Sequence, residues 1–221
     1  MEKIRVLIAI PYVKDICIGL TKFLSSIEGK DKYEVEVFPL REIPIDSSRN
    51  RMVKHFLKSN NDYLLMIDDD ITPPPDILKM TEHGKDIISA LCFVIQNGVP
   101  YPLLMRKEEE KGYKILTGEG IDTVTRVGGV GTGCLMMSRK ALETIKAPWF
   151  LFPRDEYGIM SLGEDYYFSR KAEEAGFELF VDITKQCGHT KDIDLKALSV
   201  RFTELMTKKR GEEKKDDTTK V

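Results

Sequence analysis

Tyr63-Leu64-Leu65-Met66-Ile67-Asp68-Asp69-Asp70 is the stretch that decides the fold, because an apolar run delivers three consecutive carboxylates to its C-terminal end. The run from Tyr63 to Ile67 predicts a strand. In an extended backbone Asp68 and Asp70 would share one side of the chain, while Asp69 would point to the other. Ligands of open α/β sheets bind beyond the carboxyl ends of strands, and hard divalent cations prefer carboxylate oxygens. The stretch therefore predicts a metal that holds a phosphate, although a plain Asp-rich turn before three prolines explains the same residues.

Strand-like and helix-like segments alternate around this stretch. Ile4 to Ile10 is a continuous apolar run, typical of a strand buried on both faces, and apolar residues recur at helical spacing from Ile16 to Ile27. The other segments are a strand over 33–37, a loop containing Pro39 and Pro44, a helix over 52–57, a short helix through Met80 and a strand over 86–93. This order predicts an α/β fold with a parallel, Rossmann-like sheet.

The middle of the chain has a weaker pattern. Residues Gly98 to Val127 mix turn residues with β-like pieces such as Tyr113 to Leu116, which predicts a solvated hairpin or flap. The run from Gly128 to Gly133 lets the backbone approach something closely, so it forms either a pocket wall or a site of tight packing. It is not a P-loop, because no Lys-Ser/Thr pair closes it. A strand from Cys134 to Met137 and a helix from Arg139 to Lys146 follow.

The end of the chain combines an apolar helical face with a charged tail. The face consists of Leu195, Leu198, Phe202 and Leu205, and it would cap the core or pair with another subunit of a homo-oligomer. Residues 208–221 have mixed charge and no apolar anchors, so they predict a disordered tail. The expected organisation is one folded domain over residues 1–207.

Composition and charge exclude several classes. The 221 residues contain 34 Lys and Arg against 36 Asp and Glu, so no overall field would attract nucleic acid or an anionic membrane. Apolar stretches are too short for a membrane span, and Met1 leads directly into a strand-like run, which predicts a cytoplasmic protein. The four cysteines lack CxxC spacing, which favours reduced, buried thiols. Few Asn and Gln beside many Lys and Glu is a pattern enriched in hyperthermophile proteins.

Two further carboxylates, Glu164 and Asp165, stand at the start of an expected helix that ends at Gly176. A carboxylate there could accept a proton from an attacking hydroxyl. Acids near a helix N-terminus also favour the helix dipole, and Ser161 and Glu164 have the spacing of a capping box. Capping accounts for Glu164 but says less about Asp165, so Asp165 is the stronger catalytic candidate.

A histidine and a basic segment supply other parts of a metal-dependent site. His189 follows the strand-like run from Glu178 to Val181, and imidazole can complete an octahedral Mn²⁺ shell, although a lone histidine is more often structural. The segment Asp46-Ser47-Ser48 offers N-cap candidates for the second helix. Arg49 or Asn50 could instead reach a diphosphate or a nucleobase.

In this order the segments resemble the GT-A glycosyltransferases, in particular small soluble members such as those encoded by phages and archaeal viruses. The resemblance covers residues 4 to about 190 and rests on Ile10-Pro11-Tyr12, Ser48-Arg49-Asn50, Tyr63 to Asp70, Gly131 to Met136, Gly163 to Phe168, and His189. Each motif alone is weak, whereas their order and spacing are specific. The resemblance implies a GT-A, Rossmann-like fold with a mixed, mainly parallel sheet flanked by helices in a single domain.

The resemblance also implies a role for each matching position. Asp68 to Asp70 match the DXD motif, His189 looks like a second metal ligand, and Asp165 resembles the base that activates the acceptor. The implied nucleotide-binding residues are Pro11, Tyr12, Arg49, Asn50, Asp68 and Asp69, the implied metal ligands are Asp70, His189 and Asp68, and the implied catalytic residues are Asp165 and Glu164. Trp149 could offer a platform to a sugar face, unless it packs in the core.

The implied activity is metal-dependent transfer of a sugar from a nucleotide-diphosphate sugar to an acceptor hydroxyl, with Mn²⁺ or Mg²⁺ as cofactor and inversion at the anomeric carbon. The acceptor would be a glycan, a protein or a small molecule, and a viral enzyme would act in the host cytoplasm. A nucleotidyltransferase that makes nucleotide sugars is an alternative, although the Ile10–Lys14 loop lacks the expected glycines. A catalytically silent nucleotide- or glycan-binding module of a virus is another, and the intact Asp70, Asp165 and His189 argue against such decay.

Overall fold

The computed structural model describes residues 2–96, 99–108, 112–116, 121–192, 194–196, 198–200, 202–204 and 207. The chain divides into two compact units. The larger unit comprises residues 1–93 and 102–190 and contains all the residues that the sequence predicts for the site. The smaller comprises 94–101 and 191–221. Its residues 195–196, 198–200, 202–204 and 207 are helical, whereas Leu205 and residues 208–221 lie outside the described part.

A seven-stranded sheet forms the centre of the larger unit, in the order β10-β12-β5-β11-β3-β1-β2. Its strands are β1 (Ile4–Tyr12), β2 (Tyr33–Arg41), β3 (Tyr63–Ile67), β5 (Ile87–Leu91), β10 (Val124–Val127), β11 (Cys134–Ser138) and β12 (Leu179–Gln186). The pairs β1–β2, β1–β3 and β5–β12 are parallel. However, β11 runs antiparallel between β3 and β5, and β10 is antiparallel to β12. The sheet is therefore mixed rather than purely parallel.

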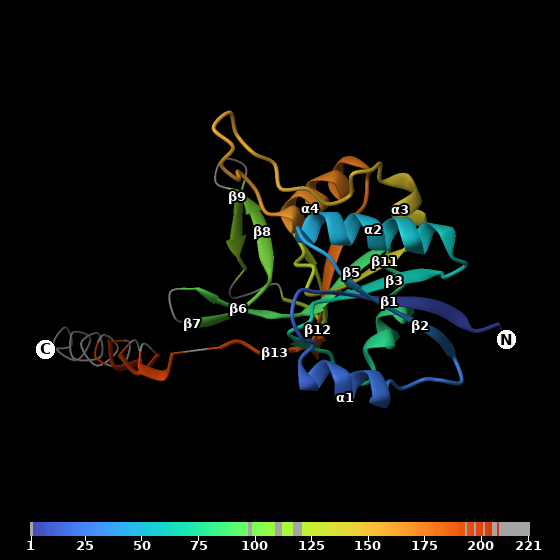
Figure 1. Ribbon diagram of the computed structural model, residues 1–221, viewed down its shortest axis with the longest axis horizontal. Helices are drawn as coiled ribbons and strands as arrows, with labels where there is room; N and C mark the ends of the chain where they lie inside the picture. The colour runs from blue at the N-terminus through green and yellow to red at the C-terminus, as the bar shows by residue number, and fades with distance from the viewer. Residues whose placement is uncertain are drawn as a thin grey trace, which may run out of the picture. The chain divides into compact units, whose positions relative to one another are not determined.

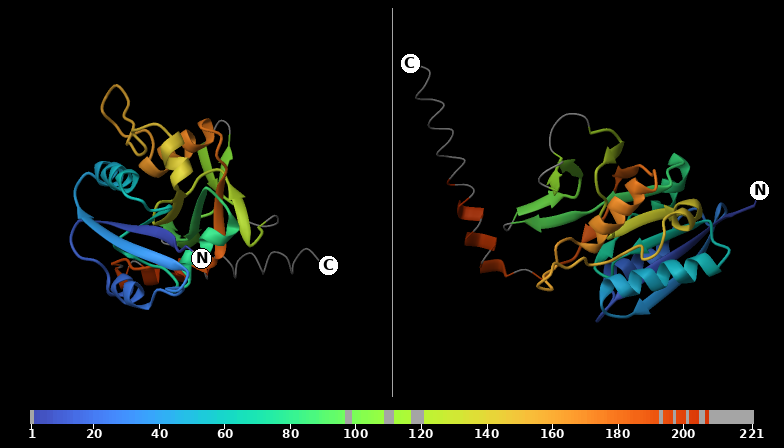
Figure 2. Two further views of the ribbon diagram at one scale, coloured as in Figure 1. Left: turned by 90° about the vertical axis from the view of Figure 1, so that its right-hand side faces the viewer. Right: turned by 90° about the horizontal axis from the view of Figure 1, so that it is seen from above.

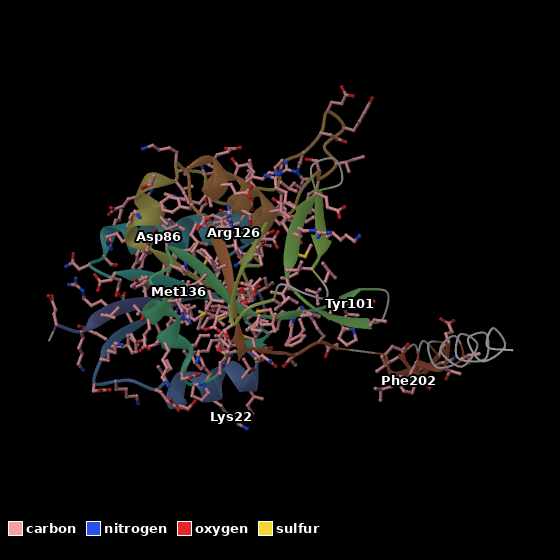
Figure 3. The ribbon with its side chains drawn as sticks, turned by 180° about the vertical axis from the view of Figure 1, so that it is seen from behind. Lys22, Asp86, Tyr101, Arg126, Met136 and Phe202 are labelled. Carbon is pink, nitrogen blue, oxygen red and sulfur yellow. The ribbon has the colours of Figure 1, made fainter. Side chains whose placement is uncertain are left out.

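Helices cover both faces of this sheet, as Figures 1 and 2 show. The helices are α1 (Ile18–Ser26), α2 (Ile45–Lys58), the 3₁₀ helix η1 (Ile77–His83), α3 (Arg139–Thr144) and α4 (Glu164–Glu174). Successive side chains of β1 enter different apolar clusters, because strand side chains alternate between faces. Leu7 and Ala9 pack in the cluster with α2, α3 and α4, while Val6, Ile8 and Ile10 pack with α1 and η1. Met136 of β11 is labelled inside the sheet in Figure 3, and Lys22 lies on the outer side of α1.

Two local expectations in the first half of the chain were wrong. Pro39 lies within β2 rather than in a loop. A strand tolerates proline at the edge of a sheet, and β2 occupies an edge position. The second helix begins at Ile45 with Pro44 as its N-cap, so the segment Asp46-Ser47-Ser48 lies inside the first turn instead of capping it.

The middle segment forms the expected hairpin. Strands β8 (Met105–Glu108) and β9 (Gly112–Ile115) pair antiparallel. The glycine-rich run that follows packs tightly against it, because a Cβ at Gly128 would lie 2.4 Å from the Lys107 backbone nitrogen and one at Gly131 would lie 2.3 Å from a Leu103 methyl carbon. Of the two interpretations of this run, tight packing is the one that these contacts support.

Two further pairs of short strands lie outside the central sheet. Strands β4 (Ile71–Thr72) and β13 (Gly188–His189) pair antiparallel, and β6 (Phe93–Gln96) and β7 (Val99–Pro102) form another two-stranded sheet. The cysteines are free, and three of the four are buried, as predicted. Within the described ranges, no helix has the length and apolarity that crossing a membrane requires.

Candidate active site

The three consecutive aspartates form a turn rather than an extension of β3. The Ile71 N–H donates to the Asp68 carbonyl over 3.1 Å, which closes the turn. The expectation that Asp68 and Asp70 share a strand face was therefore wrong. The Asp69 carbonyl accepts from the Cys17 N–H at 2.8 Å, and the Asp70 carbonyl accepts from the Thr190 N–H at 2.9 Å. The Asp68 N–H donates to the Gly133 carbonyl at 3.0 Å, so three separate segments, at Cys17, Gly133 and Thr190, fix the backbone of the turn.

The three carboxylates of this turn contact different partners. Asp68 Oδ1 lies 2.9 Å from Arg49 Nη2, and Asp69 Oδ2 accepts from the Val13 N–H at 3.3 Å. Asp70 Oδ2 lies 3.3 Å from His189 Nε2. The aspartates are therefore inequivalent, with Asp68 facing the buried side of the site and Asp70 facing the histidine.

His189 reaches Asp70 because β13 lies beside β4, in a register that places His189 opposite Ile71. Its Nδ1 lies 2.6 Å from the Phe93 carbonyl oxygen. A carbonyl oxygen can only accept, so Nδ1 carries a proton and donates it. In the neutral ring Nε2 then carries the lone pair, and it points toward the Asp70 carboxylate. His189 Nε2 and Asp70 Oδ2 therefore face each other as two electron-pair donors, and either a proton or a cation between them would stabilise this arrangement.

A divalent cation fits this donor set in part. A neutral imidazole and a carboxylate are both suitable ligands for Mn²⁺, and the carbonyl bond at Nδ1 is the usual means of orienting a metal-binding histidine. Among the described residues, no group of three or more His, Cys, Asp or Glu side chains could enclose a metal ion. Asp70 and His189 would therefore hold a cation only together with oxygens of a ligand or water.

Arg49 connects the aspartate turn to α4. Its side chain is only 3 % exposed, and its Nε lies 3.3 Å from Glu164 Oε1 in addition to the contact with Asp68. Two carboxylates from different elements thus share one buried guanidinium. Arg49 Nη1 is also buried and has no hydrogen-bond partner within the described chain. A buried donor without a partner is costly, so it is suited to receive an oxygen of a bound molecule.

The N-terminus of α4 lacks the expected capping box. Gly163 is the N-cap and provides no side-chain bond, while the Ser161 hydroxyl donates instead to the Pro153 carbonyl at 3.2 Å. Glu164 is free to turn to Arg49 and is 13 % exposed. Capping therefore does not explain Glu164, whereas the ion pair with Arg49 does.

Asp165 has the most perturbed acid chemistry of the site. Burial, followed by the negative charge of Glu164, raises its pKa to about 6. The Tyr166 N–H opposes this shift by donating to Asp165 Oδ1 at 2.8 Å. A Cβ at position 163 would lie 2.7 Å from the same oxygen, so Gly163 allows this carboxylate orientation. Burial and the Asp165 charge also raise the pKa of Tyr166 to about 12, so the phenol stays protonated at neutral pH.

Asn50 and Trp149 organise a loop. The Asn50 amide nitrogen donates to the Asp46 and Phe150 carbonyls at 2.8 and 2.6 Å. Its amide oxygen accepts from the Trp149 and Phe150 N–H groups at 2.9 and 3.1 Å. The Trp149 indole donates to the Leu142 carbonyl and packs against the core. Both side chains therefore join α2 and α3 to the loop before α4, and Trp149 follows the core-packing alternative.

Pro11 and Tyr12 occupy the carboxyl end of β1, beside the aspartate turn. They pair with Leu40 and Arg41 of β2, and the following Val13 N–H contacts Asp69. Pro11 is buried and Tyr12 is half-buried. This edge of the sheet therefore carries the predicted nucleotide loop next to the predicted metal ligands.

One aromatic pair at the site was not expected from the sequence. The Tyr113 and Tyr166 rings stack with centroids 4.2 Å apart and an interplanar angle of 19°. Tyr166 directly follows Asp165, whereas Tyr113 comes from β9. The local sequence pattern indicates only that Tyr113 lies in a β-like segment. Because the stacking with Tyr166 depends on how the hairpin packs, no sequence signal predicted this contact.

Solved structures of known proteins share this fold. A197 from STIV matches with a TM-score of 0.60 and 23 % identity, over 85 % of this chain and 86 % of that chain. GalNAc-T7, solved with UDP, GalNAc and Mn²⁺, matches with a TM-score of 0.61 and 13 % identity, over 87 % of this chain and 45 % of its own. TarS from S. aureus matches with a TM-score of 0.51 and 14 % identity, over 83 % of this chain and 36 % of its own.

The sequence itself gives no such match, because no protein-family model and no curated protein matches it. The chain spans less than half of GalNAc-T7 and of TarS. The structural neighbours are GT-A glycosyltransferases, and the mixed sheet with its flanking helices matches theirs. The chain therefore has the GT-A fold of glycosyltransferases.

Proposed function

We propose that this protein is a metal-dependent glycosyltransferase that moves a sugar from a nucleotide-diphosphate sugar to an acceptor hydroxyl with inversion. The observation that carries the proposal is the chain of contacts from Asp68 through the buried Arg49 to Glu164, beside Asp165. It links a candidate cation pair, Asp70 and His189, to a candidate base. The GT-A fold supports the same conclusion.

The donor end is formed by the aspartate turn and its neighbours. Asp70 and His189 would hold Mn²⁺ or Mg²⁺, and the cation, when bound, supplies positive charge that stabilises a departing diphosphate. Asp68, which Arg49 orients, would face the nucleotide ribose rather than the cation. Arg49 Nη1 is the donor available to the nucleotide. Pro11 and Tyr12, which precede the Val13 N–H that contacts Asp69, would contact the nucleobase.

The acceptor end is formed by the first turn of α4. With a pKa of about 6, Asp165 is mostly ionised at neutral pH and is still more basic than an ordinary carboxylate. General bases work best with a pKa near the working pH. Asp165 takes the proton of the acceptor hydroxyl as that oxygen attacks the anomeric carbon. Glu164 stays on Arg49 and keeps a second negative charge beside the base.

The test is Mn²⁺-dependent release of nucleoside diphosphate from a panel of UDP-, GDP-, ADP- and dTDP-sugars. We expect one donor to be hydrolysed slowly without an acceptor. Asp70→Ala should abolish this release, and Asp31→Ala, an exposed aspartate on a loop, should leave it unchanged.

Other outcomes would contradict the proposal. Binding of nucleotide sugars without turnover would indicate a silent binding module. Pyrophosphate release from a nucleoside triphosphate and a sugar 1-phosphate would indicate a nucleotidyltransferase. If neither Mn²⁺ nor any nucleotide sugar changed the thermal stability of the protein and calorimetry detected no binding, the proposal would be wrong.

A further inference from the structure

A cavity of about 610 Å³ lies between the β8–β9 hairpin and α4, and of its lining residues only Tyr113 belongs to the site described above. Figure 1 shows the hairpin beside this helix. A cavity of this volume is within the usual range for small-molecule sites. Its side chains come from both elements and are Lys107, Glu108, Tyr113, Arg170, Glu173 and Glu174.

Glycine contacts hold the hairpin where it forms one wall of this cavity. The Gly128 N–H donates to the Met105 carbonyl at 2.7 Å. A Cβ at Gly129 would lie 2.8 Å from the Tyr113 ring and 3.2 Å from the Tyr166 ring. Any larger residue at position 129 would therefore push the two rings away. On the other side, Lys107 Nζ contacts Glu173 Oε2 at 2.5 Å and ties the hairpin to α4.

An aromatic ring connects the cavity to the candidate base. Tyr113 lines the cavity and stacks on Tyr166, which follows Asp165 in the chain. The Tyr113 hydroxyl is buried and makes no hydrogen bond of normal geometry within the described residues, although Arg170 lies close enough to lower its pKa against the effect of burial. Such a hydroxyl suits a ligand that brings its own hydrogen-bonding groups.

The charges of the lining determine which ligand class fits. The lining holds two cations, Lys107 and Arg170, and three glutamates, and Glu108 is also paired with Arg106 and Lys114 outside the lining, so it presents no strong excess of positive charge to a phosphate or carboxylate. Lys107 is already paired with Glu173. Paired groups still offer donors and acceptors to hydroxyls without a strong net field. An aromatic ring in the lining, combined with mixed donors and acceptors, is suited to a neutral, polyhydroxylated ring.

We propose that this cavity is a binding site for neutral carbohydrate of two or more sugar units. Its α4 residues lie about 8–14 Å along the helix from Asp165, at 1.5 Å rise per residue. If the proposed transfer reaction is correct, the cavity holds the part of a glycan acceptor that lies beyond the reacting sugar. The binding itself requires neither the donor nor the metal, so it can be tested separately.

The test is saturation-transfer NMR on the full chain without nucleotide or metal. The probes are cellobiose, lactose, mannobiose and N,N′-diacetylchitobiose, with glucose 1-phosphate as the anionic probe. We expect at least one neutral disaccharide to bind and glucose 1-phosphate not to bind. Tyr113→Ala should weaken that binding about tenfold. Tyr113→Phe keeps the ring and should bind within about threefold, and Tyr157→Ala, a tyrosine that is 80 % exposed on another loop, should match the unmodified protein.

The opposite results would overturn the site. Absence of binding by all four disaccharides, equal binding of glucose 1-phosphate, or unchanged binding by Tyr113→Ala would each contradict it. If Tyr113→Ala fails to fold, Glu174→Trp fills the cavity from an exposed position and should reduce the binding instead. Disaccharide binding without donor hydrolysis would contradict the proposed function but support the carbohydrate site. Donor hydrolysis without disaccharide binding would support the proposed function but contradict the carbohydrate site.

Discussion

The proposed donor and acceptor ends of the site are built by different means. At the donor end, the aspartate turn is fixed by backbone hydrogen bonds from three segments, and Asp70 meets His189 through the pairing of two short strands. At the acceptor end, Tyr166, which follows Asp165 in the chain, stacks on a hairpin whose close approach depends on the glycine pair 128–129. Backbone bonds tolerate side-chain changes, whereas packing does not. The two ends should therefore respond differently to substitution.

The largest expected effect separates the two ends by activity. Asp70→Ala should abolish both donor hydrolysis and Mn²⁺-dependent thermal stabilisation by nucleotide. Asp165→Asn should lower transfer by about 10²–10⁴, because it removes the base, but it should keep the Mn²⁺-dependent stabilisation. Thermal shift with Mn²⁺ and a nucleotide sugar measures the second effect. Loss of that stabilisation in Asp165→Asn would show that the two ends are not separable.

Next in size is the link between the ends. Arg49→Met should lower the free energy of unfolding by about 3 kcal/mol, because Asp68 and Glu164 would lose their shared buried partner. Arg51→Met is the matched control on the same helix, since Arg51 is 62 % exposed and its ion pair should contribute less than about 1 kcal/mol. Urea unfolding of both variants measures the difference. Equal losses would mean that burial of Arg49 contributes no more than a surface ion pair.

The pH dependence of stability should carry the signature of Asp165. Its folded pKa of about 6 lies above the value of about 3.9 in unfolded chains, so the folded state binds the proton more tightly. The resulting stability is fully present below pH about 4 and is lost as pH rises through about 6, by about 2–3 kcal/mol. Asp165→Asn should remove this loss and be more stable than the unmodified protein at pH 7.5. Parallel curves for the two proteins would contradict the assignment.

A smaller effect should come from the glycine run. Gly128→Ala should cost about 1–3 kcal/mol, because its Cβ would lie 2.4 Å from a backbone nitrogen of β8 that cannot turn away. Gly133→Ala is the control, since its nearest contact would be an ordinary 3.4 Å to Cys92 Sγ. Chemical unfolding measures both. If the control were the more costly variant, the hairpin would not depend on this close approach.

The smallest expected effect concerns the start of α4. Ser161→Ala should change stability by less than about 0.5 kcal/mol, because Ser161 is exposed and contacts the Pro153 carbonyl instead of capping the helix. Loss of a true N-cap would cost about 1 kcal/mol. Thermal unfolding distinguishes the two values, and a loss of about 1 kcal/mol would support the capping-box interpretation of Ser161 instead.

Sequence pattern predicted the contacts around the aspartate turn better than those around α4, for a physical reason. Strand β3 and the following aspartates are contiguous, and the periodicity of the strand sets their place at the sheet edge. The contact between His189 and Asp70 was expected only through the order of motifs. Tyr113 was missed because its stacking depends on tertiary packing of a hairpin with weak pattern. The turn at Asp68 was misjudged because strand alternation stops where the strand stops.

The local errors have equally specific causes. Propensity placed Pro39 in a loop, but an edge strand need not use every N–H for pairing. Spacing placed a capping box at Ser161 and Glu164, but the buried Arg49 competes for that carboxylate with a full charge. In both cases tertiary structure, which the local sequence does not reveal, overrode a local preference.

The hydrogen bonds to the three backbone carbonyls of the aspartate turn reduce the conformational entropy that would be lost when a ligand binds. A loop that must order around its ligand loses affinity to that ordering, at about 1–2 kcal/mol for each backbone residue fixed. Here the backbone of residues 68–70 is already held by Cys17, Ile71 and Thr190. Nearly all of the attraction between carboxylates and a cation can therefore appear as affinity, and association need not wait for a loop to rearrange.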